Sequence, residues 1–320
     1  MTYDSRPAIE VEGVSRSYGD VLAVDNVQFS IPRGQIVGLL GHNGAGKTTT
    51  IKMMTGFLEP SHGTIKVNGL RVDEHSLEVQ QKIGYLPEHS PLYPEMTVVE
   101  YLAFVARIRN VPAPQIQSAV LEAMKSTDLA SKMHAKIQTL SKGFRQRVGV
   151  AQAIVHKPDI LILDEPTSGL DPAQISAMRD LIKSLAKHST ILLSTHIMQE
   201  VEAICDRVII IMQGHVAVDS MLQDLQKSHD LTMLLKQPSS EVSPFLSEMP
   251  GVEDVSLVSE HDGFYRYAIR STEVGRRDLA PNLVRKVTEK GWDLYQVAPE
   301  VRDLETVFRD VNSGKGNHYA

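Results

Sequence analysis

The sequence has a single cysteine, Cys205, among its 320 residues. One cysteine excludes an internal disulfide and is typical of a protein that works in a reducing compartment. Cys205 follows Ile204, so we expect it to be a small buried apolar residue and not a reactive thiol.

Long apolar runs are also missing. The apolar runs at 160–163 and 208–212 are far shorter than the ~20 residues that a membrane-spanning helix needs. The stretch 1–9 lacks the apolar core of a signal peptide. Any membrane role is therefore expected to come through a partner.

No excess of one charge is present either, because 33 Lys and Arg residues stand against 39 Asp and Glu residues. A protein that binds nucleic acid usually presents a strongly basic face. We therefore expect no nucleic acid as a partner.

What the sequence does contain is the pattern G-x-x-x-x-G-K-[ST] at residues 41–48, between an apolar strand-like stretch (35–40) and a helix-like one (49–54). Glycines let the backbone turn sharply and point its N–H groups at phosphates, and the helix dipole adds to this attraction. The pattern predicts a loop that binds ATP, with the ammonium of Lys47 at the β- and γ-phosphates and the Thr48 hydroxyl on Mg²⁺. The predicted nucleotide-binding residues here are Gly41, His42, Asn43, Gly44, Ala45, Gly46, Lys47, Thr48 and Thr49.

Two carboxylates, Asp164 and Glu165, end the apolar strand 160–163. Acids at the end of a buried strand are not ordinary solvated charges. We expect Asp164 to hold Mg²⁺ and Glu165 to polarise the attacking water. His196, which ends the strand at 190–194, is interpreted as a sensor of the γ-phosphate.

The order of elements predicts two domains. Strands and helices alternate from 159 to 212, which implies a mainly parallel sheet with covering helices, preceded by an antiparallel part at 9–31. We place this first domain at 1–228, with a helical insert at about 93–156. A β-α-β-β-α-β order over 229–312 predicts a small ferredoxin-like α+β accessory domain, and 313–320 is expected to be a flexible tail.

Taken together, these motifs resemble the ATP-binding subunit of an ABC transporter, a P-loop NTPase with a mixed sheet, an antiparallel subdomain and a helical insert. The resemblance covers about residues 8–225. Its motifs, in the family's order, are the A-loop aromatic Tyr18, Walker A (41–48), the Q-loop near Glu88, the signature (140–144), Walker B (160–165), the D-loop (168–171) and the switch histidine His196.

The resemblance implies an ATPase that works as a head-to-tail homodimer. Tyr18 would stack on adenine. Ser141 and Gly143 would contact the γ-phosphate bound by the second copy, and Asp171 would report across the interface. The insert and the Q-loop would line a groove for a membrane permease, although the apolar face at 101–105 can equally be core.

Two motifs depart from the family pattern, the signature at two residues and the Q-loop at one. Lys142 and Phe144 stand where the common signature LSGGQ has glycine and glutamine, while Ser141 and Gly143 remain. Glu88 stands where the Q-loop usually has glutamine. A carboxylate can still supply an oxygen to Mg²⁺, so we hypothesise that Glu88 is a ligand; the alternative is that it points to solvent.

The finer resemblance is to ATPases of bacterial ABC-2-type exporters, in the branch named for gliding motility. It is carried by the stretches 84–88, 92–94 and 140–148 and by the C-terminal stretch 304–308. It implies an ATPase on the cytoplasmic face of the inner membrane, held there by its permease. An importer ATPase and a non-transport ATP-driven clamp remain as alternatives.

Overall fold

The computed structural model describes residues 6–271, 279–301 and 303–312. They form two compact units, one up to Leu222 and one from Gln223 onward. The sequence interpretation placed a domain boundary a few residues later, at 228/229. The predicted tail at 313–320 lies outside the described residues.

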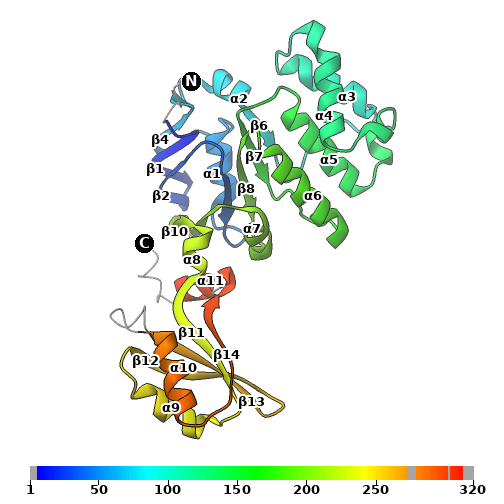
Figure 1. The fold of residues 1–320 in the computed structure, drawn as a ribbon. Coiled ribbons are helices and arrows are strands. Elements are labelled where there is room, and N and C mark those ends of the chain that lie inside the picture. Colours follow the sequence, from blue (N-terminus) through cyan, green and yellow to red (C-terminus); the bar gives the residue numbers. More distant parts are fainter. Residues whose placement is uncertain (1–5, 272–278, 302, 313–320) are drawn as a thin grey trace. The chain divides into compact units, whose positions relative to one another are not determined.

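The first unit contains two sheets (Figure 1). The larger sheet has, in spatial order, β10 (His215–Met221), β9 (Arg207–Met212), β3 (Ile36–Leu40), β8 (Thr190–Thr195), β7 (Ile160–Asp164) and β6 (Ile83–Leu86). Its strands are parallel except β10, which pairs antiparallel with β9. The smaller, antiparallel sheet has β2 (Val21–Ile31), β1 (Ile9–Tyr18), β4 (His62–Val67) and β5 (Leu70–Arg71).

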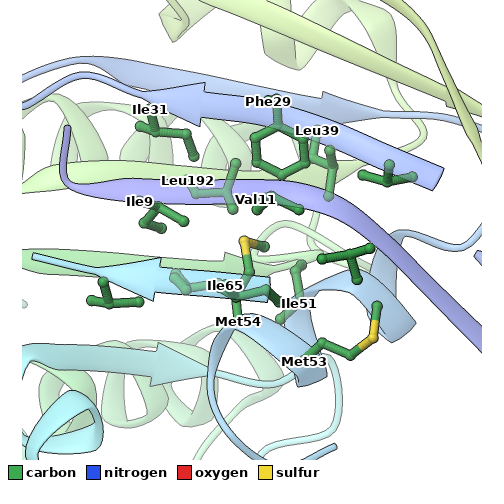
Figure 2. Close-up of a cluster of buried hydrophobic side chains, with 14 of the residues drawn as sticks. Ile9, Val11, Phe29, Ile31, Leu39, Ile51, Met53, Met54, Ile65 and Leu192 are labelled. Atoms are coloured by element: carbon green, nitrogen blue, oxygen red, sulfur yellow. The ribbon is translucent and has the colours of Figure 1, made fainter. Parts of the chain in front are cut away.

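The main core of this unit is built by both sheets and by α1 (Lys47–Met54). Figure 2 shows side chains from the smaller sheet, among them Ile9, Phe29 and Ile65, beside Leu39 and Leu192 of the larger sheet. All residues of β3, β7 and β8 are buried. Such continuous apolar strands are expected where a parallel sheet is covered on both faces.

The predicted helical insert is present as α3 (Val98–Ile108), α4 (Ile116–Ser126) and α5 (Lys142–Ile154), which Figure 1 shows on the side of β6 and β7 away from the smaller sheet. These helices have their own apolar cluster, around Leu102, Val120 and Val148. A capping box starts α3: the Thr97 side chain accepts from the Glu100 N–H, and the Glu100 carboxylate accepts from the Thr97 N–H at 2.9 Å. The remaining helices of this unit are α2 (Ser76–Lys82), α6 (Pro172–Leu185) and α7 (Met198–Ile204).

The short helix α8 (Leu222–Gln226) lies at the division between the units. The second unit then runs β11 (Lys227–Leu235), α9 (Ser239–Ser247), β12 (Val252–His261), β13 (Phe264–Ser271), α10 (Leu279–Glu289), β14 (Leu294–Val301) and α11 (Leu304–Asn312). The sheet order β12-β13-β11-β14 is antiparallel throughout. This is the split βαβ arrangement, so the β-α-β-β-α-β order predicted from the sequence is present.

Among the described residues, none of the helices combines the length and the apolar character needed to cross a bilayer.

A close backbone contact joins the insert to the larger sheet at Gly84 of β6. A Cβ atom built on Gly84 would lie 2.1 Å from the backbone carbonyl oxygen of Ala153 in α5 and 2.9 Å from the Pro158 ring. A backbone group cannot rotate out of the way as a side chain can, so only glycine fits here.

We predict that Gly84→Ala lowers the free energy of unfolding by about 3 kcal/mol, because α5 must move away from the sheet. The control is Gly34→Ala. Gly34 has φ 76° and no heavy atom within 4 Å of its built Cβ, so only backbone strain of ~1 kcal/mol is expected there. Urea denaturation followed by circular dichroism measures both. Equal losses in the two variants would contradict the argument.

Candidate functional site

The glycine-rich loop joins the end of β3 to the start of α1. Gly46 caps α1 with φ 108°, and a Cβ atom on it would lie 2.8 Å from the carbonyl oxygen of Ala23. This position therefore needs glycine for its conformation and for its close packing. The loop ends at a helix N-terminus, where free N–H groups and the helix dipole attract an anion.

The ammonium of Lys47 is buried within this loop. It donates to the carbonyl oxygens of Gly41, at 2.8 Å, and of His42, at 3.3 Å. It lies 3.8 Å from an oxygen of Glu165. Burial lowers the pKa of Lys47, and the nearby carboxylates of Glu165, Asp164 and Glu88 oppose that shift. These contacts place one buried cation at the centre of a group of acids.

Asp164 lies at the end of β7, directly beside Ser194 of β8. Its Oδ1 accepts a short hydrogen bond from the Ser194 hydroxyl and a longer one, 3.4 Å, from the Thr48 hydroxyl. Its Oδ2 is buried without a hydrogen-bond partner among the described residues. Burial raises the pKa of Asp164, whereas both hydroxyl contacts lower it.

This donor set fits a hard divalent cation. An unpartnered buried carboxylate oxygen is costly, and a cation beside Thr48 and Asp164 would remove that cost. Hydroxyl and carboxylate oxygens are the ligands that Mg²⁺ prefers.

Glu165 follows Asp164 in a left-handed backbone conformation, with φ 50°. Its N–H group is held by the carbonyl and by the hydroxyl oxygen of Ser194, each at 3.1 Å. The Nδ1 atom of His196 lies 3.0 Å from both carboxylate oxygens of Glu165. The Glu165 side chain is only 8% exposed while that of His196 is 44% exposed, so the pair spans from the interior to the open site.

A cavity of about 500 Å³ connects these groups. Its lining includes most of the residues predicted from the sequence: Asn43, Gly44, Gly46, Lys47, Thr48, Thr49, Glu88, Glu165 and His196. Ala23, which was not predicted, and Ser168, the first residue of the predicted D-loop, also line it. Glu88 lines the cavity with an exposed side chain, and its charge influences Lys47 and Asp164. Its role as a Mg²⁺ ligand stays a prediction.

Ser194 was also missed by the sequence interpretation. It lies one residue before Thr195 in a strand that was predicted. Aligning that strand in parallel with the one ending at Asp164 would have placed the serine beside the acid.

Tyr18 ends β1, is 47% exposed and is not among the residues lining the cavity. The Arg16 guanidinium lies 5.1 Å from the centre of its ring. The Tyr18 ring is thus exposed but carries Arg16 over it, and its predicted contact with adenine stays a prediction.

The signature and D-loop residues lie close to one another, and apart from Ser168 they do not line this cavity. Ser141 caps α5, its hydroxyl accepting from the Phe144 N–H at 3.4 Å, and Asp171 caps α6 by accepting from the Gln174 N–H at 2.9 Å. A Cβ atom on Gly143 would lie 2.4 Å from the Gln174 side-chain oxygen. Gln174 therefore contacts both motifs, Gly143 through its side chain and Asp171 through its backbone N–H.

A second hollow, here called the insert groove, has a volume of about 470 Å³ and runs between α2, β6 and α3. Aromatic and apolar side chains dominate its wall, among them Phe57, Leu77, Tyr85, Tyr93, Tyr101, Phe104 and Ile108. Phe57 is 66% and Leu77 75% exposed. Large exposed apolar groups that gather in one hollow mark an interaction surface.

The sequence left two roles open for the apolar face of α3, part of the core or part of a docking surface. In the structure, this face does both. Leu102 belongs to the buried cluster of the insert, whereas Tyr101, Phe104 and Val105 also line the insert groove.

Comparisons with known proteins agree with this site. Residues 24–168 match the model of the ABC transporter family. The chain is 33% identical to the uncharacterized ABC transporter ATP-binding protein YxlF of Bacillus subtilis over 95% of this chain and 99% of that one. It is 39% identical to the Nod factor export ATP-binding protein I of Ralstonia nicotianae over 66% of each chain.

Among solved structures, the ATP binding subunit of an ABC transporter superposes with a TM-score of 0.63 at 33% identity, over 68% of this chain and 92% of that one. The match with YxlF extends through both units, and the ABC family model covers the glycine-rich loop and both acids that end β7. The chain belongs to the family of ABC transporter ATP-binding proteins.

Proposed function

We propose that this ABC ATPase is the motor subunit of an ABC-2-type transporter, working as a homodimer that drives a separate membrane permease in export. The observation that carries the ATPase part is the contact of Glu165 with His196, on the wall of the cavity that also contains Lys47. An acid held by a histidine beside a phosphate-binding cation is suited to activating water against a terminal phosphate.

In this proposal the glycine-rich loop binds the phosphates of ATP, and Lys47 exchanges its two carbonyl contacts for phosphate oxygens. Thr48, Asp164 and Glu88 are the residues that would hold Mg²⁺, which supplies charge neutralisation at the phosphates when bound. Glu165 accepts the proton of the attacking water. His196 orients Glu165 and contacts the γ-phosphate.

The second copy is invoked because Ser141, Gly143 and Asp171 do not line the nucleotide cavity of their own chain. The N-terminus of α5 can serve an anion bound by another chain, in a head-to-tail pair with two ATP molecules between the copies. Binding energy from ATP would then close the pair and hydrolysis would release it. Tyr18, with its exposed ring, would stack on adenine.

The permease would dock in the insert groove. An apolar segment of the membrane partner could cover Phe57, Leu77 and Ile108, which water now contacts. This places the ATPase at the cytoplasmic face of the membrane. Export is favoured by the name of the Nod factor export relative and by Glu88 in place of the usual glutamine. We also propose that the chain belongs to the gliding-motility branch of these exporters and that residues 229–312 form an accessory domain.

The first test uses a tagged Glu165→Gln variant, which should bind ATP but hydrolyse it only slowly. Hydrolysis should fall by about 10² to 10⁴, because the group that accepts the proton is lost. Purification from detergent-solubilised membranes with ATP and Mg²⁺ should then yield two copies of the chain with a multi-spanning membrane protein. The matched control is Glu202→Gln, an acid on α7 outside the cavity, which should hydrolyse ATP normally.

A Glu165→Gln protein that is a dimer without a membrane protein, or that carries ribosomes or DNA, would instead support a non-transport clamp. A transported substrate that accumulates inside the cell when the ATPase is active would make the system an importer.

The second test concerns Glu88. If its carboxylate is a Mg²⁺ ligand, Glu88→Ala should raise the Mg²⁺ concentration for half-maximal ATP hydrolysis by about tenfold. Glu88→Gln keeps an oxygen ligand and should shift it less. Glu95→Ala removes an exposed acid from the same segment, outside the cavity, and should leave the Mg²⁺ dependence as it is. An unchanged Mg²⁺ dependence in Glu88→Ala would show that Glu88 is not a ligand.

A further inference from the structure

The insert groove has a distinctive charge pattern. Among the described residues that line it, Arg109 is the one with a charged side chain; the others are apolar, aromatic or uncharged polar residues. A segment that covers the groove must therefore bury apolar surface and one cation together.

Arg109 follows directly after α3 and caps it, its backbone N–H bonding to the Val105 carbonyl. One arm of its guanidinium, Nη1, donates to the carbonyl oxygen of Gln80 in α2 at 2.6 Å. This bond fixes the side chain against the groove wall. The guanidinium is therefore positioned before any partner arrives.

Within the part of the chain that the structure describes, Arg109 has no carboxylate within 4.0 Å. Burial lowers its pKa, and no neighbouring acid counteracts that shift. A partly buried arginine is ordinarily paired with an acid, because its charge is costly to remove from water.

The residues around Arg109 cannot supply the missing charge. Burial, with a smaller contribution from the Arg109 charge, lowers the pKa of His156 to about 4, so this imidazole is neutral at physiological pH. A small cavity that Arg109 also lines has the cationic residues Lys82 and Lys157 in its wall. None of the described residues provides a counter-charge within ion-pair distance of Arg109, so a partner can provide it.

Closing the groove with a purely apolar segment would desolvate the guanidinium further and leave most of its five N–H donors without acceptors. A carboxylate would instead take up two of these donors in the planar, bidentate geometry that arginine favours. The surrounding aromatic wall would exclude water from such a pair and strengthen it.

We infer that Arg109 receives a carboxylate from the membrane partner, so that the segment docking in the insert groove combines apolar anchors with one Asp or Glu. This inference rests on the proposed function, because the occupant is the permease. It adds the chemistry of the docking segment: an acid placed to meet Arg109, between side chains that cover Phe57, Leu77 and Ile108.

The test compares wild type with Arg109→Ala, Arg109→Lys and Arg107→Ala in the purification of the transporter complex from solubilised membranes. Arg107 is an exposed residue of the same helix and does not line the groove, so Arg107→Ala is the matched control. Removing one partner of a buried charge pair should weaken binding by about 30-fold or more. We expect Arg109→Ala to lose the permease, Arg109→Lys to keep part of it and Arg107→Ala to keep all of it.

ATP hydrolysis by the isolated chain is the folding control, since Arg109 lies outside the nucleotide cavity. Arg109→Ala should hydrolyse ATP as wild type does. If it does not, the amount of permease recovered with Arg109→Lys can still be compared with wild type. This comparison tests the charge pair in a chain that keeps a cation at residue 109.

A zero-length carbodiimide cross-link identifies the acid itself. Arginine does not react, but the amine introduced by Arg109→Lys should form an amide bond, with loss of water, to the one permease carboxylate that lies against it. The amine introduced by Arg107→Lys should not. Mass spectrometry of the linked peptides should show an Asp or Glu flanked by apolar residues.

The inference is wrong if wild type and Arg109→Ala recover the same amount of permease, or if the new amine links to a second copy of this chain. A different result would contradict the proposed function itself. If wild type itself recovers no membrane protein, the transporter assignment falls, and the inference about Arg109 falls with it.

Discussion

The parallel pairing of β7 with β8 is the constraint on which the candidate site depends. Because Asp164 lies opposite Ser194, the acid meets a hydroxyl at the sheet edge. The same register places Glu165 against the backbone of Ser194 and within reach of His196. A slip of one residue would turn these side chains to the other face. Since both strands are buried throughout, such a slip would also misplace side chains that are close-packed on both faces of the sheet.

Much of this arrangement could be predicted from the sequence, because it depends on local patterns. The glycine-rich loop, the acids ending β7 and the histidine after β8 each belong to one strand-and-turn segment. In parallel sheets such turns gather at one edge. Ser194 was missed because its role comes from a neighbouring strand. In the first unit, β10 was not predicted at all. β10 is an edge strand of mixed character, so it lacks the apolar run that identified its neighbours.

Glu88 and Lys142, two of the residues that depart from the family pattern, have different surroundings. Glu88 adds a third acid to a site that already contains Asp164 and Glu165, and the one buried cation there is Lys47. The electrostatic cost of the Glu88 charge therefore depends on what binds in the cavity. Lys142 begins α5, away from that cavity, and its ammonium approaches Gly169, which has φ 67°. A charge at this point changes the surface presented to a partner without changing the phosphate-binding loop.

The contact of Gly84 with Ala153 has a mechanical consequence. Most helices rest on a sheet through side chains, which absorb small displacements by changing rotamer. Here one backbone rests directly on another, so there is nothing compliant between them. A tilt of α5, which begins at the signature, would be transmitted to β6 with little loss. Because Glu88 lies two residues beyond the end of β6, the glycine acts as a stiff joint between the two motifs.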